Sequence, residues 1–284
     1  MDMDSLLEKY EAVRDFHEVN PYVFMAAVKR ERKWGFVDEE GAEVVPCRYE
    51  EVGDFWEGKA AVQRGGKWGF VDWEGDEVVP CRYEDVRDFS GGKAAVKREG
   101  KWGFVNKEGA EVVPCRYEKV RDFEGGKAAV QYEGRWGFVD WEGDEVVPCR
   151  YEEVWDFKEY RAAVQRAGKW GFVDEEGREV VPCRYEEVRD FEEGKAVVKR
   201  EGKWGYVDRQ GEEVVPCRYE KVRDFGGGMA AVQREGKWGF VDEEGQEVVP
   251  CIYEEVWNFR RGKAVVKRDG KWGYVDKEGR EFGL

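Results

Sequence analysis

A Trp-Gly pair recurs every 34 residues along this chain, and that spacing limits the possible folds more than any other feature. Eight such pairs are present, and they begin at Trp34, Trp68, Trp102, Trp136, Trp170, Trp204, Trp238 and Trp272. A Tyr-Glu pair follows the same period from Tyr49 to Tyr253, and a first copy at Tyr10 is set back by a longer segment at 17–25. A fixed period of this length is typical of repeat architectures, in which each unit packs against its neighbours.

Each unit contains four segments that favour β-strands. Valine, alanine and aromatic residues dominate the apolar positions, whereas leucine occurs only three times in the 284 residues. Valine and aromatic residues suit strands. In the third unit the expected strands are 93–98 (KAAVKR), 101–106 (KWGFVN), 111–113 (EVV) and 116–123 (RYEKVRDF). Glu99-Gly100 predicts a two-residue hairpin loop, and Pro114-Cys115 predicts a β-turn. Short loops of this kind join antiparallel neighbours, so each unit is predicted to be a meander.

The alternation of side chains predicts that both faces of each sheet are covered. Trp102 and Phe104 point to one side of a strand, and Gly103 and Val105 point to the other. A sheet that is apolar on both faces lies between two others, as the blades of a β-propeller do. The expected fold class is therefore an all-β repeat protein of eight antiparallel meander units. The preferred architecture is a closed eight-bladed β-propeller-like ring, with KAAV at the hub and RYEKVRDF at the rim. The alternative is an open β-solenoid or superhelix of β-hairpins.

Ring closure depends on the two ends of the repeat array. The last unit stops soon after its third expected strand, and the chain begins with a Tyr-Glu strand at 10–16. Pairing between these segments would complete an eighth blade and remove two sheet edges that invite aggregation. We therefore expect a single repeat domain at 10–284, with an irregular first unit at 17–25, after an N-terminal extension at 1–9.

Charge and cysteine usage exclude several classes of partner. The formal net charge is −15, which disfavours nucleic acid and anionic membranes. No apolar stretch approaches the ~20 residues of a membrane span, and the N-terminal residues lack the apolar core of a signal peptide. The seven cysteines occur once per unit from Cys47 to Cys251, without the close spacing of a zinc site. They are predicted to be reduced structural thiols, which indicates a cytoplasmic location.

The repeat resembles a known bacterial family. Residues 168–199 read GKWGFVDEEGREVVPCRYEEVRDFEEGKAVVK, and similar segments fill almost the whole chain after residue 9. The segment is similar to the bacterial WG repeat, also called the KWG repeat, in its G-K-W-G-F-V-D, G-x-E-V-V-P, Y-E and G-x-A-x-V elements. The resemblance implies an interaction module and does not imply a reaction. The cysteine after the proline departs from the usual family pattern.

The residues needed for catalysis are scarce. His17 is the only histidine, expected in a loop, and Ser5 and Ser90 are the only serines, so a hydrolytic triad has no basis in the sequence. The Asp174 to Gly177 turn resembles part of a calcium loop but lacks its alternating ligands. We therefore predict that the protein is not an enzyme and uses no catalytic residue, cofactor or metal.

Departures from the repeat are the best guide to a specific surface. Seven aromatic residues stand where the repeat usually has another residue type, and they form the candidate partner surface: Trp56, Trp73, Trp141, Trp155, Trp257, Tyr132 and Tyr160. Exposed aromatic residues anchor protein partners or stack on sugars. The eight Trp-Gly tryptophans are assigned to structure, with Trp170 expected to be buried between units. The predicted function is a non-catalytic interaction or self-assembly scaffold that binds an unknown protein or its own copy. The alternative is a lectin-like glycan-binding module.

Overall fold

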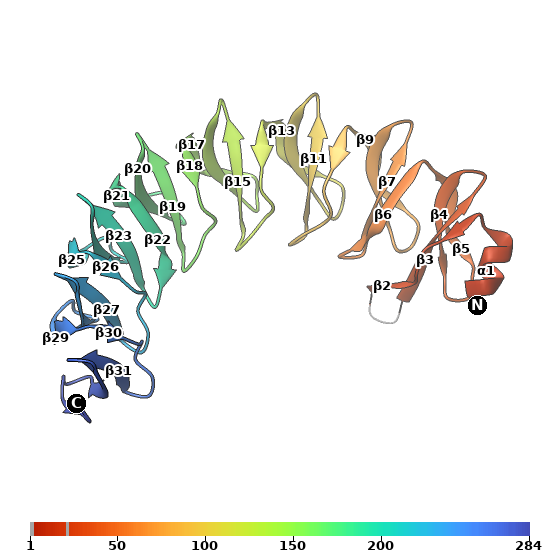
Figure 1. Ribbon diagram of the computed structural model, residues 1–284. Coiled ribbons are helices and arrows are strands. Elements are labelled where there is room, and N and C mark those ends of the chain that lie inside the picture. Colours follow the sequence, from red (N-terminus) through yellow and green to blue (C-terminus); the bar gives the residue numbers. More distant parts are fainter. Residues whose placement is uncertain (1–2, 21–22) are drawn as a thin grey trace. The chain divides into compact units, whose positions relative to one another are not determined.

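Antiparallel sheets follow one another along the chain, one for each repeat. The computed structural model describes residues 3–20 and 23–284, and these form two compact units, 1–149 and 150–284 (Figure 1). Each sheet has four strands in the order of the sequence, except the first sheet, which has five. The chain is thus an all-β tandem repeat, as the sequence predicts.

The first unit begins with the short helix α1 (Met3–Lys9). The first sheet then contains β1 (Ala12–Val13), β2 (His17–Asn20), β3 (Val23–Arg30), β4 (Lys33–Asp38) and β5 (Glu43–Tyr49). The second contains β6 (Glu51–Trp56), β7 (Lys59–Arg64), β8 (Lys67–Asp72) and β9 (Glu77–Tyr83). The third contains β10 (Asp85–Val86), β11 (Lys93–Arg98), β12 (Lys101–Asn106) and β13 (Glu111–Tyr117). The fourth contains β14 (Lys119–Val120), β15 (Lys127–Tyr132), β16 (Arg135–Asp140) and β17 (Glu145–Tyr151).

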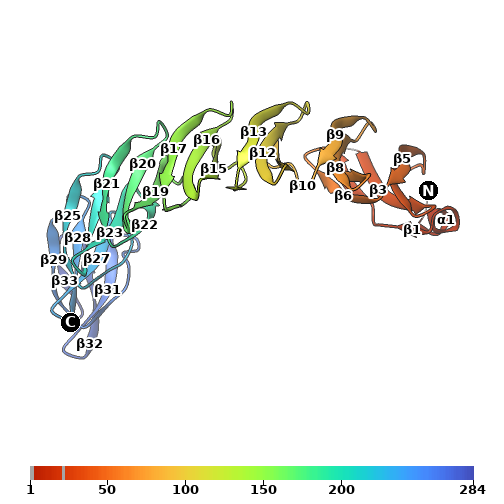
Figure 2. The ribbon, with the colours of Figure 1, turned by 90° about the horizontal axis from the view of Figure 1, so that it is seen from above.

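The second unit has the same pattern. The fifth sheet contains β18 (Glu153–Val154), β19 (Arg161–Arg166), β20 (Lys169–Asp174) and β21 (Glu179–Tyr185). The sixth contains β22 (Glu187–Glu192), β23 (Lys195–Arg200), β24 (Lys203–Asp208) and β25 (Glu213–Tyr219). The seventh contains β26 (Lys221–Val222), β27 (Met229–Arg234), β28 (Lys237–Asp242) and β29 (Glu247–Tyr253). The last contains β30 (Glu255–Val256), β31 (Lys263–Arg268), β32 (Lys271–Asp276) and β33 (Glu281–Phe282). Figures 1 and 2 show β23 and β27 in neighbouring sheets of this unit.

The predicted division of the polar strand is wrong. We expected RYEKVRDF to be one strand at the rim of its own sheet, after a turn at Pro114-Cys115. Instead β13 continues through Pro114, with a bulge that places Tyr117 opposite Trp102 and Val113 opposite Phe104. The chain then changes sheet, and Lys119 and Val120 pair with β15 of the following sheet. A two-residue strand therefore opens each typical sheet, so KAAV is its second strand and not its edge.

The predicted ring closure is also wrong. Ala12 and Val13 of β1 pair with Lys29 and Val28 of β3, within the first sheet. The last sheet already has its opening strand, because β30 pairs with β31. In the described residues no sheet closes on itself. The strand count that predicted closure was wrong because each Tyr-Glu pair lies at the boundary between two sheets. The last unit already has its opening strand, so the N-terminus has no missing strand to supply.

The irregular first unit carries an additional hairpin. His17 and Glu18 of β2 pair with Met25 and Phe24 of β3, so His17 lies in a strand and not in the expected loop. Helix α1 lies in the predicted extension, and its Leu6 is buried together with Tyr10. These two side chains pack against Ala26, Val28 and Val37 of the first sheet. The N-terminal face of this sheet is therefore covered by its own chain.

Aromatic pairs join consecutive sheets. Within each unit, the ring after a Trp-Gly pair meets, edge to face, the phenylalanine that precedes the second strand of the next sheet. Phe104 and Phe123 have ring centroids 4.9 Å apart, and Phe240 and Phe259 have centroids 4.8 Å apart. Such pairs contribute about 0.5–1.5 kcal/mol beyond the burial of their area. Because the contact is repeated, consecutive sheets within each unit are joined by one ring pair of this kind.

Glycine is required where backbones meet. A Cβ on Gly171 would overlap the carbonyl oxygen of Val181 and lie 2.7 Å from the amide nitrogen of Cys183, because the bulge in β21 folds over this position. Gly109 has the same role between sheets, since a Cβ there would overlap the carbonyl oxygen of Val78 in the preceding sheet. We expected the glycine of the Trp-Gly pair to allow close approach, and its neighbour is the bulged strand of the same sheet.

Among the described residues, no helix has both the length and the apolar character needed to cross a membrane.

Replacing Gly171 with alanine tests the backbone contact. We expect Gly171→Ala to lower the free energy of unfolding by about 1–3 kcal/mol, as overpacking does elsewhere, because the neighbouring backbone must move. Gly226→Ala is the matched control, since a Cβ at Gly226 meets nothing within 4 Å and its φ is not in the left-handed region. Guanidinium denaturation of both variants measures the difference. Equal stability of the two variants would contradict the assigned role of Gly171.

Candidate functional site

The Trp-Gly tryptophans support an arginine that joins two sheets. The guanidinium of Arg223 lies over the ring of Trp238, 4.9 Å from its centroid, and donates a 2.8 Å hydrogen bond to the carbonyl oxygen of Val256 in the next sheet. Arg87 repeats this arrangement with Trp102 and Val120. We expected Trp170 to be buried, and this prediction overstates its burial. Trp170 is half-buried, because one function of this position is to support a partly solvated side chain.

Two predicted site residues replace this arginine. Trp155 and Trp257 occupy its position in their units, and each contacts the Trp-Gly tryptophan of its own sheet instead. Trp155 lies 5.0 Å from Trp170 between ring centroids, and Trp257 lies 6.3 Å from Trp272. Trp155 is half-buried in this contact, whereas 62% of Trp257 is exposed. The two substitutions thus contact the equivalent tryptophan, but Trp257 makes the longer contact and is more exposed.

The other predicted site residues lie on separate sheets. Trp73 is half-buried against the core that joins the first and second sheets. Trp141 stacks on Phe123 at 5.2 Å, and Tyr132 meets Tyr117 edge to face at 6.5 Å. Trp56 is an exposed residue at the end of β6, and Tyr160 is exposed in a turn. The seven candidates are therefore distributed among several sheets and do not form one cluster within either unit.

An exposed aromatic face lies on the last sheet. Tyr274 is 51% exposed, although Phe240 and Tyr206, which occupy the same position in the two preceding sheets, are each 1% exposed. Trp272 and Phe282 on this sheet are also exposed. In the part of the chain that the structure describes, no further sheet follows to cover this face. We call Trp257, Val265, Trp272, Tyr274 and Phe282 the terminal face.

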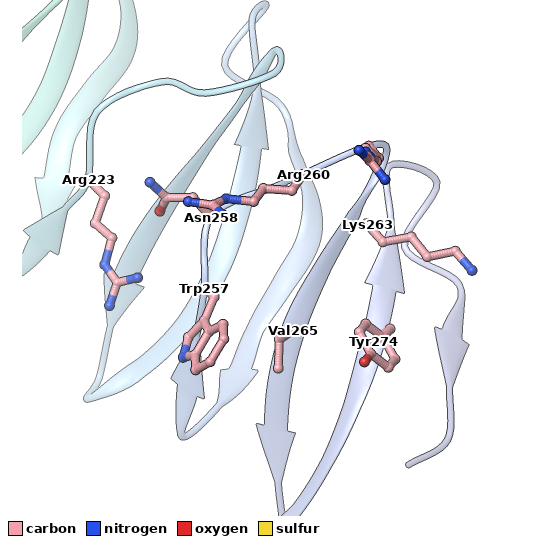
Figure 3. A pocket seen from close by; sticks show the side chains of 8 residues that line it. Arg223, Trp257, Asn258, Arg260, Lys263, Val265 and Tyr274 are labelled. Atoms are coloured by element: carbon pink, nitrogen blue, oxygen red, sulfur yellow. The ribbon is translucent and has the colours of Figure 1, made fainter.

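A cavity of about 730 Å³ opens on the terminal face. Its floor includes Trp257, Val265 and Tyr274, which lie in one row across neighbouring strands (Figure 3). Arg223 and Arg260 lie above this row in the same view. This size is within the usual range for small-ligand and peptide-anchor sites, about 300–1,000 Å³.

The cavity is basic, in contrast to the acidic chain as a whole. Its lining includes Arg223, Arg260, Arg261 and Lys263, and none of its lining residues is Asp or Glu. The carboxylates of the same sheet are held elsewhere. For example, Glu255 pairs with Lys267 at 2.9 Å. An anionic or carboxylate-bearing group would therefore meet positive charge without a competing acidic side chain in the lining.

Sequence reasoning missed three of these residues. Asn258 stands where each of the other seven units has aspartate: Asp15, Asp54, Asp88, Asp122, Asp156, Asp190 and Asp224. Arg261 stands where the other units have only glutamate or glycine, and Arg260 is the only arginine at its position. A comparison of charge between units would have found them, but only aromatic departures were considered.

The turn that carries these arginines binds carboxylates elsewhere in the chain. The carboxylate of Glu57 accepts hydrogen bonds of 2.8 Å from the amides of Gly91 and Gly92, in the equivalent turn one unit later. Lys107 pairs with Glu57 at 3.2 Å. Partial burial alone would raise the pKa of Glu57, but the amides and Lys107 outweigh it, and the pKa is lowered. Glu159 is held in the same way by the amide of Gly194 and by Arg209.

The acidic turns show how their carboxylates are used. Asp174 accepts hydrogen bonds from the amides of Glu176 and Arg178, and its second oxygen pairs with the Arg178 guanidinium at 2.6 Å. Both oxygens of the Asp174 carboxylate therefore have hydrogen-bond donors within the turn. Asp72, Glu74 and Asp76 bring three carboxylates within 4.8 Å of one another, but both amides of that turn donate to Asp72 in the same manner.

The cysteines are free thiols in half-buried positions. The thiol of Cys115 donates to the carbonyl oxygen of Val96 at 3.6 Å, and the other six cysteines make the equivalent contact, at 3.6–3.8 Å. Burial raises the pKa of Cys115 to about 11 and that of Cys149 to about 12. A thiol with such a pKa is a poor nucleophile at neutral pH.

A column of aspartates lies along one edge of the first unit. Partial burial raises the pKa of Asp88, and the carboxylates of Asp54 and Asp122 on the neighbouring sheets raise it further. Repetition places these like charges at the same position in successive sheets. Their repulsion is a cost of the repeat, and Asn258 removes one charge from the corresponding position of the last sheet.

These features define a class of protein: an all-β tandem-repeat protein whose sheets pack face to face, with a basic, aromatic cavity on its last sheet. The family follows from the sequence match. The model of the WG containing repeat matches residues 34–68, 68–102, 102–136, 136–170, 170–204, 204–238 and 238–272. The chain belongs to this family, as the resemblance of its motifs predicts. No curated protein matches its sequence.

Comparison with solved structures gives only distant similarities. A eukaryotic initiation factor is 11% identical with a TM-score of 0.39, over 96% of this chain and 88% of that one. Hsv2 of Kluyvelomyces marxianus is 11% identical with a TM-score of 0.27, over 93% and 92%. YCF48 bound to D1 peptide is 11% identical with a TM-score of 0.29, over 78% and 90%. Scores this low carry no argument about shape or function.

Alkylation should report the state of the cysteines. A pKa of about 11 leaves roughly 100-fold less thiolate at pH 8 than an ordinary cysteine has, so we expect native Cys115 to react with iodoacetamide at least that much more slowly than in the unfolded chain. Mass spectrometry of time points in buffer and in guanidinium measures both rates. Equal rates in the two conditions would show that the thiols are neither buried nor hydrogen-bonded.

Asp88→Asn should stabilise the protein at neutral pH. A raised pKa means that the folded state disfavours the charged carboxylate, so stability is lost as the pH rises through the folded-state pKa. The variant should therefore unfold at higher denaturant concentration at pH 7, and the gain should vanish below about pH 3.9. Glu84→Gln is the control of opposite sign, because amide hydrogen bonds from Gly100 and Glu99 lower the pKa of Glu84. A loss of stability in Asp88→Asn at pH 7 would contradict the repulsion.

Proposed function

We propose that this chain is a non-catalytic binding scaffold that takes a polypeptide partner on the terminal face. The observation that carries the proposal is the exposure of Tyr274, which is 51% exposed at a position that each preceding sheet buries. Exposed aromatic clusters beside a cavity are typical of interaction sites, where a few large side chains provide most of the binding energy.

The repeat architecture supports a binding role. In the second unit, the sheets before the last present an aromatic ring to a following phenylalanine, so the chain already binds apolar side chains with this surface. A partner that places an aromatic or aliphatic residue on Tyr274 would reproduce a contact made by the equivalent rings of the preceding sheets. The cavity between Trp257 and Tyr274 provides room for such an anchor.

Carbohydrate is the second candidate ligand. The indole of Trp257 is 62% exposed and lies beside the cavity, so a sugar ring can stack on it. Binding to a glycan array that is lost in Trp257→Ala would favour this candidate. Absence of binding at millimolar concentrations would remove it.

Selection of displayed peptides tests the proposed function. Random peptides on phage are selected against the wild-type protein and against Val265→Glu/Tyr274→Glu, which places two carboxylates on the terminal face. We expect enriched peptides to bind the double variant at least about tenfold more weakly, because charge desolvation opposes apolar docking. Tyr160→Glu is the matched control, since Tyr160 is 67% exposed on another sheet.

Circular dichroism melts of the three proteins verify that they are folded. Peptides that bind the wild type and Val265→Glu/Tyr274→Glu equally would overturn the terminal face as the binding site, and so would a selection from which no peptide is enriched.

A further inference from the structure

We propose that the partner on the terminal face is an acidic polypeptide segment, whose carboxylates bind the guanidiniums of Arg260 and Arg261 while an apolar neighbour packs on Trp257 and Tyr274. This inference rests on the proposed function and names the chemistry of its partner. The observations behind it are a change of charge in one unit, two arginines at a turn that have no ion pair with the described residues, and the aromatic row beside that turn.

Three of the differences in charge between the last two units lie next to one another at the turn before β31. From the seventh unit to the last, Asp224 becomes Asn258, Gly226 becomes Arg260 and Gly227 becomes Arg261. These three differences raise the local charge by three in a chain whose net charge is −15. The arginine side chains have no ion pair with any described residue, although arginines elsewhere on the sheets pair with glutamates, as Arg234 does with Glu247 at 3.2 Å. The two guanidiniums are therefore available to an external anion.

The turn itself has the geometry that binds a carboxylate in other units. Arg261 and Gly262 have φ values of 50° and 78°, close to those of the turn at Gly91 and Gly92, whose amides hold Glu57. The residue one unit before Arg261 is Gly227, which has no side chain that could bind the amides of Arg261 and Gly262 as Glu57 binds those of its following turn. The amides of Arg261 and Gly262 make no hydrogen bond within the described chain. In the equivalent turn these amides hold a carboxylate of the preceding sheet, whereas a partner's carboxylate at the terminal face would meet the two guanidiniums. Charge-assisted bonds to guanidinium groups are among the stronger hydrogen bonds.

The adjoining surface selects a polypeptide. Trp257, Val265 and Tyr274 form an apolar row next to the turn, so a segment with acidic and apolar residues in succession can satisfy both parts (Figure 3). A long nucleic acid would also bring its charge to the acidic remainder of the protein, which opposes binding. A second copy that met this face with the same face would bring two basic patches into one interface, which opposes the association. An acidic segment of a different polypeptide fits best.

Binding of a labelled copolymer tests the proposal. The probes are a fluorescein-labelled random copolymer of glutamate and tyrosine, poly-L-glutamate and a 20-residue oligothymidylate, measured by fluorescence anisotropy in low and moderate salt. We expect the copolymer to bind more tightly than poly-L-glutamate, because only the copolymer supplies apolar side chains. Binding should weaken as the salt concentration rises. The oligothymidylate should bind least.

The decisive variant is Asn258→Asp/Arg260→Gly/Arg261→Gly, which gives the last turn the residues of the seventh unit. Since those residues fold in the seventh unit, the variant should keep its structure, and we expect it to bind the copolymer at least about tenfold more weakly. The matched control adds Asp224→Asn/Gly226→Arg/Gly227→Arg to this variant, which restores the total charge beside a covered face. Binding should remain weak in the control.

Several outcomes would overturn the proposal. Undiminished binding by the triple variant would do so, and so would restored binding in the control, because net charge alone would then explain the affinity. Equal binding of the oligothymidylate would show an unselective anion site. Sedimentation that finds a wild-type dimer and a monomeric triple variant would identify a second copy as the occupant. If phage peptides still depend on Val265 and Tyr274 in any of these cases, the proposed function stands and only the acidic partner is wrong.

Discussion

The structure depends on one close approach, between the glycine of each Trp-Gly pair and the bulged strand beside it. At Gly171 the backbone of β21 occupies the space where any side chain would begin. The bulge turns the strand after its two valines, and the chain then leaves the sheet at the next Tyr-Glu pair to open the following one. Trp170 and Phe172 therefore contact Trp155 and Phe191 on one side of their strand, while Gly171 leaves room for the bulged strand on the other side.

Much of the fold could be predicted from periodicity. Repeat length, strand content and the two covered faces followed from the spacing of Trp-Gly pairs and from the alternation in KWGFV. The division of RYEKVRDF did not, because Tyr117 and Lys119 hydrogen-bond to different sheets and no local signal marks Glu118 as the point of change. Ring closure was inferred from a count of strands, and the count assigned each Tyr-Glu strand to the wrong sheet.

The candidate site was predicted only in part. Trp257 was identified because an aromatic residue replaces arginine, and its exposure agrees with a role on a surface. Trp73 and Trp155 have the same sequence signal, but Trp73 packs against the core that joins the first two sheets and Trp155 packs against Trp170. The sequence does not tell whether such an aromatic residue fills a gap or faces solvent. Asn258, Arg260 and Arg261 were missed because their significance lies in a change of charge between units, not in the residue types themselves.

The pairing of rings between sheets gives the stack a direction. Within each unit, a sheet carries the ring after its Trp-Gly pair on one face and the next sheet receives that ring, as Phe240 meets Phe259. One face of a sheet therefore presents a ring (the donor side) and the other receives a ring (the acceptor side). The two faces differ in the way that the two ends of a polar filament do. At the first sheet one side is occupied by Leu6 and Tyr10, whereas Tyr274 leaves the opposite side exposed. One sheet could therefore take the place of another only in the same orientation. A partner surface that binds in place of a sheet must resemble the side of a sheet that receives the ring.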